Sequence, residues 1–177
     1  GHYPALNTFD YMHIWYSGEN WIDYSDISPV TNWANAGGIV SCMWHWNVPK
    51  NTDSNIDDYT ATLSETVFNA QKATEEGTWE NSIVKADLEK VANMLKKLKE
   101  AKVPVLWRPL HEAAGQFFWW GKDAESFKAL WKMMFTYFKE QGLDNLIWVW
   151  TSENKDDANW YPGDEYVDII GRDLYGK

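Results

Sequence analysis

Five short apolar segments alternate along the chain with two longer segments in which apolar residues recur every three or four positions. The short segments are residues 5–9, 38–44, 103–107, 146–150 and 167–171. They are continuously apolar and do not alternate with polar residues, which is typical of strands in a parallel sheet that is covered on both faces. They therefore predict five buried parallel strands.

The longer segments predict amphipathic helices, because a spacing of three and four places side chains on one helical face. The apolar stripes are Val84, Leu88, Val91, Leu95 and Leu98 in the first segment, and Phe127, Leu130, Trp131, Met134, Phe135 and Phe138 in the second. Asp123 is placed to cap the second helix and Gly142 to end it, while Ser28-Pro29 begins a shorter helix near Trp33. Strands that alternate with helices indicate βαβ units.

Polar, aromatic and ionisable residues follow the carboxyl end of every predicted strand. These residues are Asp10-Tyr11, His45-Trp46, Arg108 to Glu112, Thr151-Ser152-Glu153 and Arg172 to Tyr175. A doubly wound sheet binds its ligand at one switch point, whereas a (β/α)₈ barrel builds its site from many strand ends. The pattern favours the α/β class and a (β/α)₈ TIM barrel. A flavodoxin-like domain is a weaker alternative, because no glycine-rich phosphate loop follows a strand.

Composition narrows the possible partners. The formal net charge of -10 argues against binding to nucleic acid or to an anionic membrane, and no apolar segment is long enough to span a bilayer. Cys42 is the only cysteine, so no disulfide can form within the chain. The 13 Trp residues have two interpretations, a Trp-rich core or a groove of flat platforms for sugar rings. Because many aromatics fall at the ends of apolar segments, the groove is favoured.

One segment points to a reaction. Residues 104–107 predict a buried strand, which is followed by Arg108, His111 and Glu112 and then by the aromatic residues 117–120. Glycosidic bonds are commonly cleaved by two carboxyl groups, of which the proton donor needs a raised pKa that apolar neighbours can supply. Glu112 is the candidate donor. The alternative is that Glu112 forms only a structural salt bridge with Arg108.

The sequence RPLHEAAGQFFWWG, residues 108–121, resembles the acid/base region of glycoside hydrolase family 26, best known for endo-β-1,4-mannanases. The segments FDYM (9–12), SCMWHWN (41–47) and YPGDEYVDIIGRDLY (161–175) resemble the ends of strands two, three and six of that family. The pair His111-Glu112 points to this family in particular, because many relatives place Asn before the acid/base.

The resemblance implies a retaining double displacement on internal β-1,4-mannosidic bonds, with Glu112 as acid/base. It matches His45 to a substrate-binding histidine, Tyr175 to a tyrosine that contacts the nucleophile, and Asp173 to an acidic residue nearby. His111, Phe117 and Trp120 complete the expected sugar site, although Trp120 is chosen only for its aromatic position. Many members carry Trp where this chain has Phe117, which still stacks but cannot donate a hydrogen bond.

The resemblance covers the chain as strands two to six of eight. We therefore expect a single catalytic barrel domain over residues 1–177, truncated at both ends, with about five βα units. The family nucleophile, which ends strand seven, would lie outside this chain, and a companion fragment that carries the remaining strands could supply it. Glu153 follows the strand next to Glu112 but is a poor substitute, because a retaining pair must flank the sugar.

No cofactor is expected. His45 and His111 lack the spacing of metal ligands, and the acid-rich residues 53–58 lack the glycine and terminal glutamate of a calcium loop. An extracellular or periplasmic location follows only from polymer-degrading relatives. Two alternatives stay open: a barrel that binds glycan without cleaving it, and the same barrel acting on β-glucan or xylan.

Overall fold

The computed structural model describes residues 4–17, 23–153 and 156–175. One five-stranded sheet runs through the molecule, and every neighbouring pair of strands in it is parallel. In order across the sheet, its strands are β1 (Leu6–Asp10), β2 (Ile39–Trp44), β5 (Val105–Pro109), β6 (Leu146–Ser152) and β7 (Ile169–Arg172). All five predicted strands are confirmed, with bounds that differ from the expected ones by no more than two residues.

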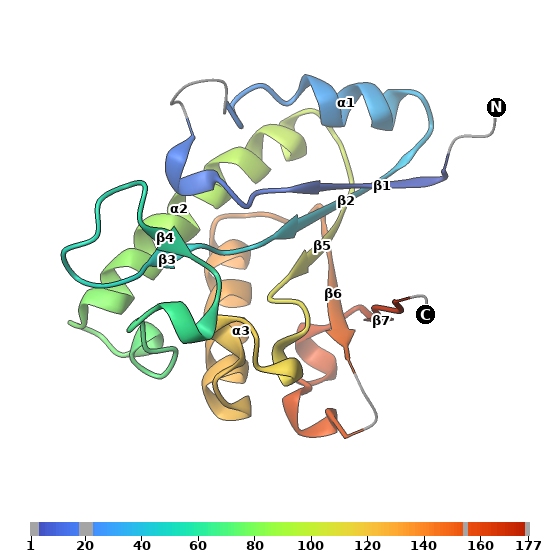
Figure 1. Ribbon diagram of the computed structural model, residues 1–177. Coiled ribbons are helices and arrows are strands. Elements are labelled where there is room, and N and C mark those ends of the chain that lie inside the picture. Colours follow the sequence, from blue (N-terminus) through green and yellow to red (C-terminus); the bar gives the residue numbers. More distant parts are fainter. Residues whose placement is uncertain (1–3, 18–22, 154–155, 176–177) are drawn as a thin grey trace.

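The strand order follows the chain order and never reverses, so the carboxyl ends of consecutive strands are neighbours along one edge. Figure 1 shows the strands turning progressively from β1 to β6. This arrangement is that of consecutive strands in a barrel wall and has no switch point of the doubly wound kind.

Three α-helices accompany the sheet: α1 (Ser28–Asn35), α2 (Trp79–Glu100) and α3 (Ala124–Glu140). Short 3₁₀ helices lie in the connecting segments: η1 (Ile14–Tyr16), η2 (Leu63–Glu65), η3 (Lys72–Thr74), η4 (Ala113–Gly115), η5 (Trp119–Gly121), η6 (Ala158–Trp160) and η7 (Asp164–Tyr166). The predicted boundaries of α3 are confirmed, because the carboxylate of Asp123 accepts the Ser126 amide at 2.8 Å and Gly142 has φ of 76°. None of the helices in the described ranges has the length and apolarity needed to cross a bilayer.

The polar excursion at residues 47–60 is anchored at both of its ends. Strands β3 (Val48–Pro49) and β4 (Tyr59–Thr60) pair antiparallel, and Val48 is fully buried. A bridge between Thr62 and Phe118 then joins this region to the aromatic segment after β5. Two loops at the carboxyl edge of the sheet are therefore held together by backbone pairing.

Eight of the thirteen tryptophans belong to the buried core of the described residues. Six of these eight are fully buried: Trp44, Trp46, Trp107, Trp119, Trp120 and Trp131. Trp44 and Trp46 stack with ring centroids 3.9 Å apart, and the Trp46 indole N–H donates to Asp87 at 2.9 Å. For these six residues the prediction of sugar platforms is wrong, because a ring without exposed surface cannot stack on a ligand.

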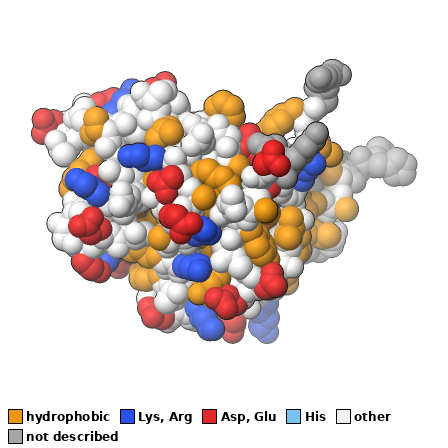
Figure 2. All heavy atoms as spheres, turned by 90° about the horizontal axis from the view of Figure 1, so that it is seen from below, with side chains coloured by type: hydrophobic (Ala, Val, Ile, Leu, Met, Phe, Trp, Pro, Cys, Tyr) orange, Lys and Arg blue, Asp and Glu red, His pale blue; other side chains and the backbone are white. Residues whose placement is uncertain are grey.

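The prediction that the sheet is covered on both faces is confirmed for the central strands, where consecutive residues such as 40–42 and 148–151 are buried, and is wrong for the edge strands. Apolar side chains remain exposed on the edge strands and on β2, including Leu6 (41%), Ile39 (51%), Ile169 (43%) and Ile170 (62%). On the face shown in Figure 2, apolar side chains gather in patches among scattered charges, and Lys and Arg form no continuous basic surface there. The central strands therefore supply the core, while the edge strands β1 and β7 are only partly covered.

Candidate active site

A pocket of about 350 Å³ lies at the carboxyl ends of β2, β5 and β7. Its lining residues are Met43, His45, Arg108, His111, Glu112, Phe118, Asp173, Leu174 and Tyr175. Five of the seven predicted site residues are among them: His45, His111, Glu112, Asp173 and Tyr175. Residues from three separate strand ends meet because the strands are parallel and all end at this edge.

Glu112 lies in a strained turn directly after β5. Its φ and ψ are 53° and 30°, and Leu110 and Gln116 also have positive φ, at 51° and 60°. A non-glycine residue in this left-handed region costs about 1 kcal/mol or more. Three such residues within seven positions show that the surrounding contacts hold the turn in place. This turn aims the Glu112 side chain into the pocket.

The Glu112 carboxylate accepts a hydrogen bond from the Tyr175 hydroxyl. This contact raises the pKa of the Tyr175 phenol to about 12, because Glu112 as a hydrogen-bond acceptor favours the protonated phenol. The resemblance matched Tyr175 to a tyrosine that contacts the nucleophile, whereas here its hydroxyl lies on the acid/base candidate. Tyr175 thus joins the end of β7 to the turn after β5.

Arg108 does not form the structural salt bridge with Glu112 that was the alternative to a catalytic role. Its guanidinium forms an ion pair with Asp173, and its Nε donates to the Thr151 hydroxyl at 3.0 Å. The Arg108 and Asp173 side chains are only 19% and 24% exposed. Thr151 of β6 and Asp173, directly after β7, thereby hold the Arg108 guanidinium. The Glu112 carboxylate remains available to groups that enter the pocket.

Two imidazoles form the floor of the pocket. Nε2 of His45 lies 3.1 Å from Nε2 of His111, and Nδ1 of His45 lies 2.5 Å from the Asp10 carboxylate. Burial, followed by the neighbouring His45 and Arg108, lowers the pKa of His111 to about 3, so this ring is neutral. Burial alone would raise the pKa of Asp10, but its hydrogen bonds with the ring and amide of His45 more than offset that effect and lower it.

The aromatic segment divides between pocket and core. Phe118 lines the pocket and stacks on Trp120, with ring centroids 4.4 Å apart. Trp120 itself is fully buried and donates its indole N–H to the His111 carbonyl at 3.0 Å. The structure therefore does not bring Trp120 to the pocket as expected, because the Phe118 ring covers it. Phe117 lies outside the pocket lining and is 64% exposed.

Glu153 lies under the Glu112 turn and not in the pocket lining. Its amide donates to Asp157 at 2.6 Å, and a Cβ added at Gly115 would lie 2.4 Å from its carboxylate. One carboxylate oxygen is buried and has no hydrogen-bond partner among the residues that the structure describes. Burial, with the charge of Glu112 next in weight, raises the pKa of Glu153. A half-buried carboxylate packed against the backbone of Gly115 is poorly placed to attack a sugar, which agrees with the low expectation for Glu153 as nucleophile.

Sequence reasoning missed Asp10, Phe118, Met43 and Thr151. Asp10 and Thr151 could have been found, because both occupy the same strand-end positions as the chosen residues. Phe118 could not be separated from its aromatic neighbours by sequence alone. Together the site offers one carboxyl group as proton donor or acceptor, a pair of imidazoles for hydroxyl groups, and an aromatic surface for an apolar sugar face.

Known proteins share this architecture. The crystallised GH26 domain of a Prevotella bryantii endo-beta-mannanase/endo-beta-glucanase is 48% identical, with a TM-score of 0.93 over 99% of this chain and 60% of that chain. A beta-mannanase from a symbiotic protist of the termite Reticulitermes speratus, crystallised with gluco-manno-oligosaccharide, is 42% identical, with a TM-score of 0.84 over 99% of this chain and 56% of that one. These likenesses confirm the barrel fold class, of which this chain supplies part.

Curated relatives agree with the structures. A mannan endo-1,4-beta-mannosidase of Thermothelomyces thermophilus is 38% identical over all of this chain and 38% of its own length. Mannan endo-1,4-beta-mannosidase B of a Piromyces species is 42% identical over 79% of this chain and 23% of its own length. The chain thus spans well under half of these relatives. The profile of glycosyl hydrolase family 26 matches residues 1–177. The chain belongs to glycosyl hydrolase family 26.

Proposed function

We propose that this chain supplies the acid/base side of the active site of an endo-β-1,4-mannanase. The observation that carries the proposal is the position of Glu112, held by a strained turn at the end of β5 in a pocket with two imidazoles and Phe118. A donor carboxyl group beside hydroxyl-binding and sugar-stacking groups is what glycoside cleavage requires. The names of the related mannanases support mannan as the polymer.

In this proposal Glu112 protonates the glycosidic oxygen as the bond to the anomeric carbon breaks. A nucleophilic carboxylate outside this chain forms the glycosyl-enzyme intermediate. Glu112 then removes a proton from the water that releases the sugar, so its protonation state is restored and the anomeric configuration is retained. Tyr175 orients Glu112 through its hydroxyl.

The remaining site residues would bind the sugars. His45 and His111 face hydroxyl groups, Phe117 and Phe118 offer ring surfaces, and Asp173 fixes Arg108. Trp120 acts by supporting Phe118. The barrel strands that carry the nucleophile would belong to another part of the protein or to a companion fragment, and we place the enzyme outside the cell or in the periplasm, where its polymer is found.

The test compares Glu112→Gln with the parent in the complete protein, with mannan as substrate. Loss of a general acid and base should lower kcat by about 10²- to 10⁴-fold, while binding of manno-oligosaccharide persists. Glu100→Gln is the matched control, because Glu100 ends α2 and is exposed.

Near-parental turnover in Glu112→Gln would exclude Glu112 as acid/base. Binding of manno-oligosaccharide without release of sugar by the parent would instead favour a barrel that holds glycan without cleaving it. Release from β-glucan or xylan at rates above those on mannan would change the proposed polymer but leave the role of Glu112 intact.

A further inference from the structure

Asp10 holds His45 through two contacts at the end of β1. One carboxylate oxygen accepts the His45 amide at 3.0 Å, and the other lies 2.5 Å from Nδ1 of the ring. Asp10 does not line the pocket that contains His45. Its hydrogen bonds therefore reach the pocket through the histidine.

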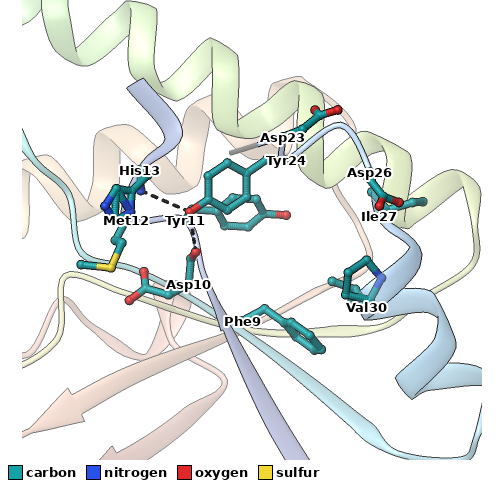
Figure 3. Close-up of a pocket in the computed structure, with 11 residues that line it drawn as sticks. Phe9, Asp10, Tyr11, Met12, His13, Asp23, Tyr24, Asp26, Ile27 and Val30 are labelled. Atoms are coloured by element: carbon teal, nitrogen blue, oxygen red, sulfur yellow. Dashed lines mark hydrogen bonds between the residues drawn. The ribbon is translucent and has the colours of Figure 1, made fainter. Parts of the chain in front are cut away.

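Asp10 is itself fixed from the opposite side. The Tyr24 hydroxyl donates to the Asp10 carbonyl at 2.9 Å and accepts the His13 amide at 3.2 Å. Figure 3 shows these two bonds, with the Asp10 carboxylate pointing away from the Tyr24 ring. Tyr11, which is 5% exposed, packs against Tyr24 with ring centroids 5.2 Å apart. Two tyrosines thus anchor the main chain of Asp10 and leave its carboxylate to His45.

The contacts determine where the ring protons lie. An ionised carboxylate only accepts hydrogen bonds, so the short contact with Asp10 requires a proton on Nδ1 of His45. A neutral imidazole has one N–H, which leaves Nε2 of His45 as an acceptor. The facing Nε2 of His111, 3.1 Å away, must then carry the proton between the two rings.

The buried side of His111 agrees with this assignment. Its Nδ1 has no hydrogen-bond partner in the described chain. If the proton of His111 lay on Nδ1, a buried N–H donor would be unsatisfied, and the two Nε2 atoms would face each other without a proton unless His45 were a cation. The neutral pair with His111 as donor avoids both costs.

We propose that Asp10 is a positioning residue that holds the proton of His45 on Nδ1. His45 then presents an acceptor and His111 a donor, and the two imidazoles together recognise one sugar hydroxyl. When this hydroxyl replaces the contact between the rings, its oxygen accepts from Nε2–H of His111 and its hydrogen is donated to Nε2 of His45. This recognition rests on the proposed function, whereas the arrangement of protons does not.

The first test is nitrogen NMR of the histidine rings in the complete protein without ligand, at a pH where both rings are neutral. Signals are assigned by their loss in His45→Gln and His111→Gln. We expect the parent to show His45 protonated at Nδ1 and His111 protonated at Nε2. A parent in which His45 carries its proton on Nε2 overturns the proposal, and this result requires no turnover.

The second test is Asp10→Asn, because an asparagine amide can donate to Nδ1 and release the tautomer. We expect the His45 signals to shift toward the Nε2–H form and kcat/KM on mannan to fall by about 10- to 100-fold. Asp53→Asn is the matched control in the exposed excursion and should change neither. Parental tautomers and parental kcat/KM in a folded Asp10→Asn protein would refute the positioning role. An inactive parent with the expected tautomers would refute only the proposed function.

Discussion

The layer beneath the helices and the pocket at the strand ends contain buried groups of different kinds. On the buried face of α3, the fully buried Trp131 and Phe138 pack against Trp148 of β6. In the pocket, buried or half-buried polar groups are joined in pairs across strands, as in Arg108 with Asp173 and His45 with His111. The first region is held by apolar contact area and the second by specific partners.

Because of this difference, we expect substitutions in the first region to affect stability and substitutions in the second to affect function. Removing a ring from the helix-covered layer leaves a cavity, and the cost appears in the free energy of unfolding. Removing one member of a polar pair in the pocket changes the orientation or proton position of its partner, and the cost appears first in turnover or binding. The aromatic segment after Glu112 spans both regions and gives the sharpest comparison.

The largest effect on stability is expected for Trp120→Ala. Trp120 is fully buried, and its removal should lower the free energy of unfolding by about 3–5 kcal/mol, measured by denaturant titration. Phe117→Ala, in the same segment but 64% exposed, should change it by less than about 0.5 kcal/mol while weakening manno-oligosaccharide binding severalfold, measured by calorimetry. Equal losses of stability in the two variants would show that this segment does not divide between core and exposed surface.

The sequence alone predicts much of this arrangement. Hydrophobic periodicity places β5 and α3 correctly, and the parallel order then requires His45, Glu112 and Tyr175 to meet, because all three follow strand ends. The roles of Phe118 and Trp120 could not be separated, since their directions depend on η5 and on the left-handed Gln116.

The sequence also could not predict which side chains from distant positions along the chain would form contacts. Arg108 forms its ion pair with Asp173, 65 residues away, and not with the nearby Glu112. Asp10 lies beside His45 because of the register between β1 and β2. Such choices depend on distances between strands, which residue patterns do not encode. The same limit applies to tryptophan, because a pattern shows that a ring lies at a strand end but not which way it faces.

Two buried acids extend the comparison to pH. In the helix-covered layer, burial raises the pKa of Asp87 to about 6, although the Trp46 indole and Lys90 oppose the shift. The folded state then binds more protons than the unfolded one between the ordinary aspartate pKa of 3.8 and about 6, so this group's contribution to stability is present at low pH and is lost as pH rises through that window. Asp10, whose pKa is lowered, contributes in the opposite sense, and its stabilisation is lost as pH falls.

Asp87→Asn should therefore gain stability relative to the parent as pH increases from about 4 to about 8, by up to about 3 kcal/mol. The asparagine oxygen can still accept the Trp46 indole N–H, so the hydrogen bond is kept. Denaturant unfolding of both proteins at a series of pH values measures the difference, with Asp53→Asn as the surface control. A difference between variant and parent that is constant with pH would mean that Asp87 ionises alike in the folded and unfolded states.

The smallest effects on stability are expected for alanine substitutions at Gly115 and Gly121, the two glycines that flank the aromatic segment. A Cβ at Gly121 would lie 2.4 Å from the carbonyl oxygen of Ala113, the residue after Glu112, whereas a Cβ at Gly115 would meet only the end of the Glu153 side chain. Backbone cannot yield without moving the Glu112 turn, but a glutamate side chain can rotate. Gly121→Ala should thus destabilise the protein by about 1–3 kcal/mol and lower kcat, while Gly115→Ala should cost less than about 1 kcal/mol.

Adding Glu153→Ala to each glycine variant decides whether these causes are correct. The second change should remove the remaining cost of Gly115→Ala, because the clashing carboxylate is gone, and should not relieve Gly121→Ala, whose clash is with backbone. Relief of both variants would mean that the turn shifts as a whole and that Glu153, more than the backbone of Ala113, fixes its position. The strained conformation of Glu112 would then depend on the neighbouring strand β6, and the pocket would be more tightly coupled to that strand than the separate contacts of Arg108 imply.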